Sequence, residues 1–415
     1  MAASTGSKLM DRFVEKMAKA KVDTNKEEFE VLYPTGFPAL DYLNGTIINV
    51  NGNGINSRYR SVGLVDGSSN MFIGRSGCGK STLVYQIIGN MAKQFPQADI
   101  FIDDIEGSLP MSRKEFLLGM DAEEIGRRVS MRNTGITTEN VYQRIQAIHA
   151  AKLENPAEYQ YDTGLYDTYG NRIFKLYPTI YCIDSFAMLM PEDVVDKEEL
   201  DKTGMGASGM AKMNTNLIKK ISQFLRAANI ILITINHIMD DIQIGFLPKP
   251  AQLSGLKQGE RLPGGKTALY ITNNLIRLDD KNTLKEDADY GINGSVVEVS
   301  IIKSRTNQNR THVPLVFDKT NGGFDQTLSM LHFLKTMGKI GGVGNKCYFE
   351  DYPDIKFSKK NFRAELVENE ELQKAFTESC RMVLDPLLSN TANQSAIHSS
   401  FDIGSALSKL EMDEV

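Results

Sequence analysis

The sequence predicts an α/β fold built on a mainly parallel, twisted sheet, and three observations lead to that class. Short apolar segments alternate with longer segments of helical periodicity from Val62 to Asp325, as parallel strands joined by crossover helices require. Residues 230–235 (IILITI) are almost entirely apolar, which is typical of a strand buried on both faces. A glycine-rich loop at 74–81 stands between a predicted strand and a predicted helix.

The predicted elements follow one another along this region. Strands are expected at 71–74, 100–102, 179–183, 230–235, 269–278 and 296–302, and helices at 82–91, 139–152 and 211–228. The segment 157–176 is rich in Tyr, Asp and Gly and is expected to leave the sheet as an excursion such as a hairpin. Residues 44–61 contain Asn and Gly at high density, which predicts a surface loop.

Changes in composition predict three regions. Residues 1–32 form an N-terminal arm with an amphipathic helix at 7–22, which packs either on its own core or on a neighbouring subunit. Residues 33–325 form the main core. Residues 326–415 form a small C-terminal region, helical at 327–337, that ends in a flexible tail rich in serine and acidic residues.

The composition is that of an ordinary globular protein and excludes several classes. The 415 residues include 47 Lys and Arg and 52 Asp and Glu, for a formal net charge of −5, so a contact with nucleic acid needs a local basic surface. There is no apolar run of membrane-spanning length, and residues 1–10 lack the apolar stretch of a secretory signal. Four scattered cysteines favour reduced thiols over a zinc site. We therefore expect a cytoplasmic protein without membrane contact.

Residues 74–81 (GRSGCGKS) match the phosphate-binding pattern G-x-x-x-x-G-K-[ST]. The glycines let backbone N–H groups point at phosphate oxygens, and the dipole of the following helix adds positive potential. Lys80 is expected to reach the β- and γ-phosphates, and the Ser81 hydroxyl to bind Mg²⁺. ATP and Mg²⁺ are therefore the predicted cofactors. The expected nucleotide-binding residues are Gly74, Arg75, Ser76, Gly77, Cys78, Gly79, Lys80, Ser81 and Thr82.

A carboxylate ends another predicted strand. Asp184 follows 179–183, and the carboxyl ends of parallel strands meet at the ligand edge of such a sheet. There Asp184 could hold Mg²⁺ through water, or it could only cap the strand. We take Asp184 with Ser81 as the predicted magnesium site.

Two further strands also end in polar groups. Asp103, Asp104 and Glu106 follow one of them, and one of these carboxylates could polarise the attacking water as a general base. Asn236 and His237 end the other, where they could sense the γ-phosphate and pass its presence to the next segment. A solvated acidic turn and hydrogen-bonded structural groups are the respective alternatives.

The order of these segments resembles the RecA-type strand-exchange recombinases, most closely their bacteriophage members. The resemblance covers about residues 33–325. The matching segments are TGFPALDYLNG (35–45), GRSGCGKS (74–81), FIDDIEG (101–107), TIYCIDSFAML (179–189), IILITINH (230–237), PGGKTALYITNNLIRLD (263–279) and IIKSRT (301–306). It implies a RecA-type P-loop ATPase core that assembles on single-stranded DNA as a helical filament, with nucleotide between neighbouring subunits. The implied activity is DNA-dependent ATP hydrolysis with homologous pairing and strand exchange in recombination and repair.

The resemblance also implies roles for individual residues. Glu106 would be the catalytic glutamate, although it stands one position later than in the family, and Asp104 is the alternative. Arg113 follows the proline after which the family places an adenine-stacking tyrosine, and a guanidinium can cover a flat base instead. Lys303 and Arg305 occupy alternate positions at a strand end and would reach the γ-phosphate of a neighbouring subunit.

Two segments would line the filament axis, about 191–208 and about 238–265. The second contains or adjoins basic side chains that can pair with phosphates and an aromatic ring that can stack on bases. His237 would link ATP to this segment. The expected DNA-binding residues are Phe246, Lys249, Lys257, Arg261, Gly264, Gly265 and Lys266.

Two other functions stay open on the sequence. A replicative helicase with a RecA core would share Lys80, Asp184 and a cation from the neighbour, but would form a closed ring. A catalytically weak RecA-like mediator would agree with the displaced position of Glu106. The expected partners are single-stranded DNA, homologous duplex DNA, further copies of the chain, and single-strand-binding or mediator proteins.

Overall fold

The structure is a computed structural model, and it describes residues 30–107, 109–195, 207–240, 256–263, 269, 272–285, 290–306, 311–388 and 397–398. The chain divides into two units, Met1–Glu30 and Val31–Val415. The arm and the helix predicted at 7–22 lie outside the described residues. The second unit contains the elements described below.

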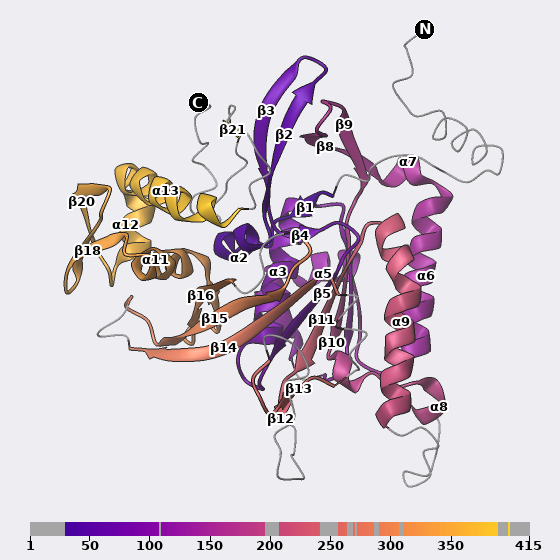
Figure 1. Cartoon of the computed structure of the whole chain (residues 1–415). Helices are drawn as coiled ribbons and strands as arrows, with labels where there is room; N and C mark the ends of the chain where they lie inside the picture. The colour runs from indigo at the N-terminus through magenta and orange to yellow at the C-terminus, as the bar shows by residue number, and fades with distance from the viewer. Residues whose placement is uncertain are drawn as a thin grey trace. The chain divides into compact units, whose positions relative to one another are not determined.

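Nine of the described strands form one mixed sheet in the order β17-β16-β15-β14-β5-β11-β10-β6-β7 (Figure 1). The six from β14 to β7 run parallel, and β15, β16 and β17 extend the sheet by antiparallel pairing. The parallel strands are β5 (Ser69–Gly74), β6 (Asp99–Asp104), β7 (Val129–Arg132), β10 (Thr179–Asp184), β11 (Ile230–His237) and β14 (Asn274–Leu284). The antiparallel strands are β15 (Gly294–Lys303), β16 (Thr311–Asp318) and β17 (Gly323–Asp325). The prediction of an α/β fold with a mainly parallel sheet is confirmed.

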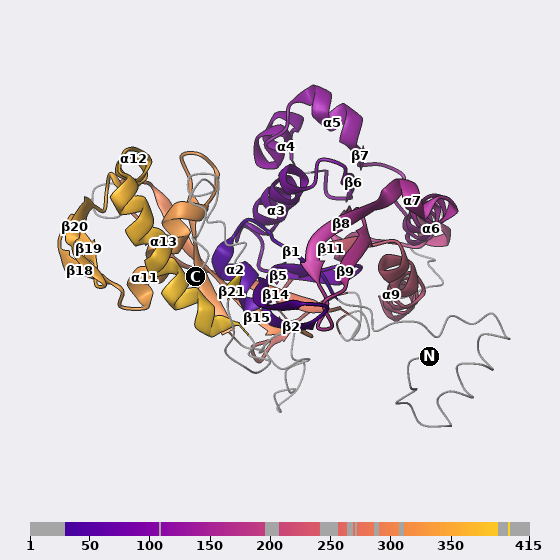
Figure 2. The same ribbon diagram turned by 90° about the horizontal axis from the view of Figure 1, so that it is seen from above.

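Helices cover both faces of the parallel strands (Figure 2). On one face lie α3 (Lys80–Gln94), α4 (Met111–Leu118) and α5 (Ala122–Arg128), and on the other lie α6 (Thr138–Glu154) and α9 (Ala207–Ala227). Leu217, Ile221 and Leu225 recur at helical spacing along α9 and pack in one core with Ile230 and Leu232 of β11. Because the intervening Ile231 and Ile233 are also fully buried, β11 is covered on both faces, as its apolar sequence predicts.

The prediction of a surface loop at 44–61 is wrong. These residues form a hairpin of β2 (Thr46–Gly52) and β3 (Ile55–Ser61). Asn53 and Gly54 form its turn with φ of 50° and 78°, the left-handed conformation that a two-residue hairpin turn requires and that Asn-Gly adopts readily. The high density of Asn and Gly marks a tight turn between strands and not a long loop.

The hairpin expected within 157–176 is confirmed, with β8 (Gln160–Tyr166) and β9 (Arg172–Leu176). Its turn contacts the turn of the β2–β3 hairpin, where Asn53 Nδ2 donates to Asn171 Oδ1 at 2.9 Å. The strand predicted at 269–278 instead spans Asn274–Leu284. The polar run from Asp280 to Thr283 stays extended because it pairs with β15 while its side chains are exposed.

Residues 326–388 form a smaller group of elements after β17. Four phenylalanine rings, Phe349, Phe357, Phe362 and Phe376, pack there with centroids 4.8–6.3 Å apart. The elements are α11 (Gln326–Thr336), β18 (Ile340–Val343), β19 (Lys346–Phe349), β20 (Tyr352–Ser358), α12 (Phe362–Glu368), α13 (Glu370–Leu384) and the 3-10 turn η3 (Asp385–Leu387). The tail after 388, apart from β21 (Ile397–His398), lies outside the described residues.

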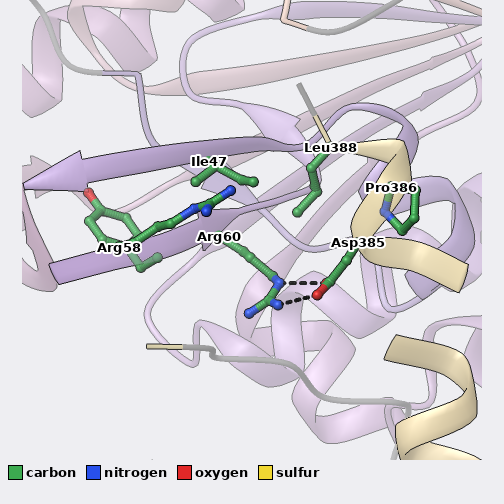
Figure 3. Close-up of a pocket in the computed structure, with 7 residues that line it drawn as sticks. Ile47, Arg58, Arg60, Asp385, Pro386 and Leu388 are labelled. Atoms are coloured by element: carbon green, nitrogen blue, oxygen red, sulfur yellow. Dashed lines mark hydrogen bonds and ion pairs between the residues drawn. The ribbon is translucent and has the colours of Figure 1, made fainter. Parts of the chain in front are cut away.

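An ion pair joins this region to the β2–β3 hairpin (Figure 3). Arg60 is 6% exposed, and its Nε and Nη2 donate to the carboxylate of Asp385 at 2.8 and 2.5 Å. Leu388 packs close to Gly45, immediately before the hairpin. These contacts fix the end of the described C-terminal region against β3.

The remaining elements of the described residues are short. They are β1 (Leu32–Tyr33), α2 (Pro38–Leu43), β4 (Leu64–Val65), α7 (Pro156–Tyr159), η1 (Phe186–Met188), α8 (Glu192–Val195), β12 (Met239–Asp240) and β13 (Glu260–Arg261). Within the described part of the chain, every helix is too short or too polar to cross a bilayer.

Candidate functional site

The glycine loop joins β5 to α3 and turns sharply. Gly77 and Gly79 have φ of 80° and 86°, and Gly79 directly precedes the first residue of the helix, Lys80. A side chain at Gly79 would be strained by this φ and would stand 3.0 Å from the Phe324 ring. The spacing of the glycines therefore matches the positions where the backbone must curl at the start of α3.

Lys80 lies inside this curl. Its ammonium donates to the Arg75 carbonyl at 2.9 Å, and the residue is 4% exposed. Burial lowers the pKa of this ammonium, and the nearby carboxylates of Asp184 and Glu106 oppose that shift. The cation is thus held between the loop and two acids, at the position where an anionic ligand of the loop would meet it.

Asp184 ends β10 beside Ser81. The residue is 1% exposed, and burial raises the pKa of its carboxyl to about 7, with a smaller contribution from Glu106 and Asp104. A hydrogen bond with the Ser81 hydroxyl opposes this shift. Within the described residues, Asp184 Oδ1 is buried and has no hydrogen-bond partner. An unpartnered buried carboxylate oxygen beside a hydroxyl fits a site for a hard cation such as Mg²⁺.

Glu106 and His237 meet across the sheet edge. Glu106 Oε1 lies 2.7 Å from His237 Nε2, and the Glu106 N–H donates to the Asp184 carbonyl at 3.2 Å. Burial would raise the pKa of Glu106, but the hydrogen bond with His237 and the charge of Lys80 lower it below the ordinary value. The structure therefore brings the two residues together at the carboxyl ends of β6 and β11, with His237 paired in register with Gly74.

The other two acids of this turn have buried partners. Asp104 Oδ2 forms an ion pair with Lys114 Nζ at 2.7 Å, and both side chains are less than a tenth exposed. Asp103 is fully buried and is bound by Arg132, Arg144 and the Tyr181 hydroxyl. Glu106 is the acid of this turn that reaches His237.

Lys303 and Arg305 lie at the opposite end of the sheet, near the amino ends of the parallel strands. Lys303 is in register with Leu275 near the start of β14, and its Nζ donates to the carbonyls of Leu269 and Thr272 at 3.1 and 2.7 Å. Burial and the charge of Arg305 lower the Lys303 pKa to about 8. Arg305 lines a hollow of about 300 Å³ together with Ser69, which begins β5. Both cations thus lie toward the start of β5, whereas their own glycine loop follows the end of this strand.

Arg113 lies in the first turn of α4. Its guanidinium carbon stands 5.3 Å from the centroid of the Phe116 ring, and its tip lies close to Gly322 in the turn before β17. Phe324, from the same segment, touches Gly79. One short segment therefore lies next to both Arg113 and the glycine loop.

Most of the predicted DNA-binding positions, Phe246, Lys249, Gly264, Gly265 and Lys266, lie outside the described residues. Lys257 and Arg261 are described and exposed. Arg261 belongs to β13, which pairs with β12 in a two-stranded ribbon.

That ribbon begins at the glycine loop, because the Ile238 N–H donates to the Gly74 carbonyl at 3.0 Å. Asn236 also contacts the far end of the segment, where its Nδ2 donates to the Pro263 carbonyl at 2.9 Å. Ile238 and Pro263, both described residues of the segment at 238–265, are therefore held near the candidate site.

Sequence reasoning missed Arg277 and Asp240. Arg277 is 3% exposed and binds Glu260 of β13 at 2.6 and 3.0 Å and Asp279 at 2.7 and 2.9 Å. The Arg-Leu-Asp spacing places Arg277 and Asp279 on one face of a strand, and that signal could have revealed the pair. Asp240 binds Arg75, and no local pattern indicates this contact between residues so far apart in the chain.

No protein-family model matches the chain, and the comparison with curated proteins finds no match.

Proposed function

We propose that the protein is a DNA-dependent ATPase of the RecA type that forms helical filaments on single-stranded DNA and catalyses homologous pairing and strand exchange. The observation that carries the proposal is the meeting of four sequence-predicted groups at one sheet edge. Lys80, Ser81, Asp184 and Glu106 come from three separate strand ends, and His237 joins them from a fourth. Such convergence at the carboxyl ends of parallel strands is where α/β proteins bind ligands.

Different residues of the site would bind the phosphates, bind Mg²⁺ and activate water. The glycine loop and Lys80 would hold the phosphates of ATP, and Ser81 and Asp184 would hold Mg²⁺, which supplies positive charge to the phosphate oxygens. Glu106, with its pKa below the ordinary value, is ionised at neutral pH and can accept a hydrogen bond from water that attacks the γ-phosphate. His237 orients that carboxylate through its 2.7 Å contact.

The placement of Lys303 and Arg305 supports a site shared between copies. Phosphoryl transfer requires neutralisation of charge on the γ-phosphate, and cations supplied by a neighbour make hydrolysis depend on assembly. Both cations lie toward the end of the sheet opposite to their own loop, and this position supports a role at another copy's nucleotide. A head-to-tail contact of this kind generates a ring or a helix, according to whether the rotation closes.

The test is ATP hydrolysis measured with and without single-stranded DNA, beside strand exchange between homologous substrates and electron microscopy of the complexes. The proposal expects hydrolysis stimulated by DNA, open helical filaments and exchange, all lost in Lys80→Ala. Closed rings that unwind duplex DNA would favour the helicase instead. Nucleotide and DNA binding without stimulated turnover would favour the mediator.

A further inference from the structure

Arg75, inside the glycine loop, forms an ion pair with an acidic residue beyond β11. Its Nη2 lies 2.6 Å from Asp240 Oδ1, and its Nη1 lies 3.3 Å from Asp240 Oδ2. Asp240 belongs to β12, and the chain from 241 to 259 joins β12 to β13. The ion pair thus connects the loop expected to hold phosphate with the ribbon that flanks part of the segment expected to contact DNA.

The backbone of Arg75 is also in contact with Lys80. Lys80 Nζ donates to the Arg75 carbonyl at 2.9 Å, and the same ammonium is the group expected to bind the phosphates. An ammonium has three N–H donors, so Lys80 can bind phosphate oxygens while it keeps this carbonyl, and the carbonyl then ties the backbone of Arg75 to the bound phosphates. Through Lys80, phosphate binding therefore acts on the backbone of Arg75, while the side chain of Arg75 binds Asp240.

The two strands of the ribbon are held differently. On β13, Glu260 forms a bidentate pair with Arg277, and both side chains are 4% exposed. On β12, the side chains of Arg75 and Asp240 are 55% and 71% exposed. A buried ion pair with two hydrogen bonds is costly to break, whereas water readily replaces the contacts of an exposed ion pair. The sheet thus anchors β13, and the β12 contact is the one that can respond to the loop.

Building on the proposed function, we propose that Arg75 is a positioning residue that couples phosphate binding in the glycine loop to the β12–β13 ribbon through its ion pair with Asp240. ATP then favours one placement of the ribbon, and DNA bound beyond the ribbon favours the matching placement of the loop. Thermodynamic linkage makes the two effects equal in free energy.

The experiment measures the affinity for single-stranded DNA with a non-hydrolysable ATP analogue and again with ADP. The readout is the first affinity divided by the second, and this ratio is compared between the wild type and the variants. Asp240→Asn and Arg75→Glu should each lower this ratio by about two- to fivefold, because an exposed ion pair couples weakly. The charge swap Arg75→Glu with Asp240→Arg should restore it, since the pair forms again with its signs exchanged. Asp351→Asn is the matched control, because it removes an exposed pair, Lys339 Nζ to Asp351 Oδ2 at 3.0 Å, in the C-terminal region.

The inference is overturned if both single variants keep the wild-type ratio, or if the folded charge swap stays as low as the single variants. Should the swap fail to fold in a thermal melt, Arg75→Lys is compared with Arg75→Gln. Lysine should keep more of the ratio because it keeps the charge, and equal ratios would contradict the inference. A wild-type protein that binds no nucleotide would overturn the proposed function, whereas an intact wild-type ratio with unaffected variants overturns only the role of Arg75.

Discussion

The two ends of the parallel strands differ in the charged side chains that they carry. The carboxyl end gathers the glycine loop, Lys80, Asp184 and the Glu106–His237 pair. The opposite end holds Lys303 and Arg305, and the Lys303 ammonium donates to the carbonyls of Leu269 and Thr272. On the proposed function, one end would hold the phosphates and activate water, and the other would supply the cations that such a reaction also needs.

This separation indicates why one copy of the chain is insufficient on the proposed account. The acids at the carboxyl end need cations to balance a triphosphate, and the cations of the same copy lie toward the start of β5, away from the loop that follows it. Stacking copies head to tail brings one copy's cations to the next copy's acids. Changes at the carboxyl end should therefore affect every copy's own site, and changes at the opposite end should affect only assembled protein.

The largest effect is expected from Glu106→Gln at the carboxyl end. Glutamine keeps the shape and can still bond to His237, but it cannot accept a proton, so hydrolysis should fall about 10²- to 10⁴-fold. Binding of ATP, measured by equilibrium dialysis, should remain. Glu115→Gln, in α4, serves as the control. Retention of most turnover in Glu106→Gln would assign the role of general base elsewhere.

His237→Ala, at the same end of the sheet, should separate ATP binding from the stimulation of hydrolysis by DNA. His237 contacts Glu106 on one side and precedes the β12–β13 ribbon on the other, so its loss removes a route between DNA and the acid. We expect ATP binding to remain and the stimulation of hydrolysis by single-stranded DNA to fall about tenfold. Normal stimulation in the variant would show that the relay runs through other residues.

Lys303→Arg tests the opposite end through pH. Because the pKa of Lys303 is lowered to about 8, the lysine loses its proton as the pH rises through this value, whereas arginine stays charged. DNA-stimulated hydrolysis by the wild type should therefore decline at alkaline pH, and in the variant the decline should shift upward by about one pH unit or more. The pH–rate profile of both proteins is the measurement. If the rates of both proteins declined over the same alkaline pH range, the titration of Lys303 would not be the cause of the decline.

The smallest expected effect is a gain in the stability of the folded protein when Asp184, at the carboxyl end of the sheet, is replaced by asparagine. The pKa of Asp184 is raised from 3.8 to about 7 by burial, so the folded protein binds more protons than the unfolded chain between these values, and stability falls as the pH rises through this window. Asp184→Asn removes this cost, and thermal melting at pH 8 without Mg²⁺ should show a Tm higher by about 2 °C or more. Hydrolysis should be lost. An unchanged or lower Tm would contradict the assigned burial cost.

Local patterns in the sequence were sufficient to predict the sheet class, the glycine loop and the strand that ends at Asp184. Each of these depends on residues close in the chain, such as the glycines at 77 and 79 that permit a left-handed backbone before α3. The hairpin at 44–61 was missed because Asn and Gly favour both loops and two-residue turns. The weak alternation of β2 and β3 did not decide between the two.

Contacts distant in the chain could not be predicted. The pairing of Asp104 with Lys114 and of Arg75 with Asp240 follows from which strand ends the fold brings together, and neither pair has a spacing that marks it. The contact of Glu106 with His237 joins residues whose separate positions were predicted, but the sequence did not predict their distance. Spacing indicates the type of a group and its strand end, and the fold selects its partner.

The most direct test of the shared site mixes two inactive variants. Lys80→Ala lacks a working loop but keeps its cations, and Arg305→Ala keeps its loop but lacks a cation. In an equal mixture on single-stranded DNA, random assembly places an intact loop against intact cations at about a quarter of the interfaces, so about a quarter of wild-type hydrolysis should return. A mixture as inactive as either variant alone would contradict a site formed between copies.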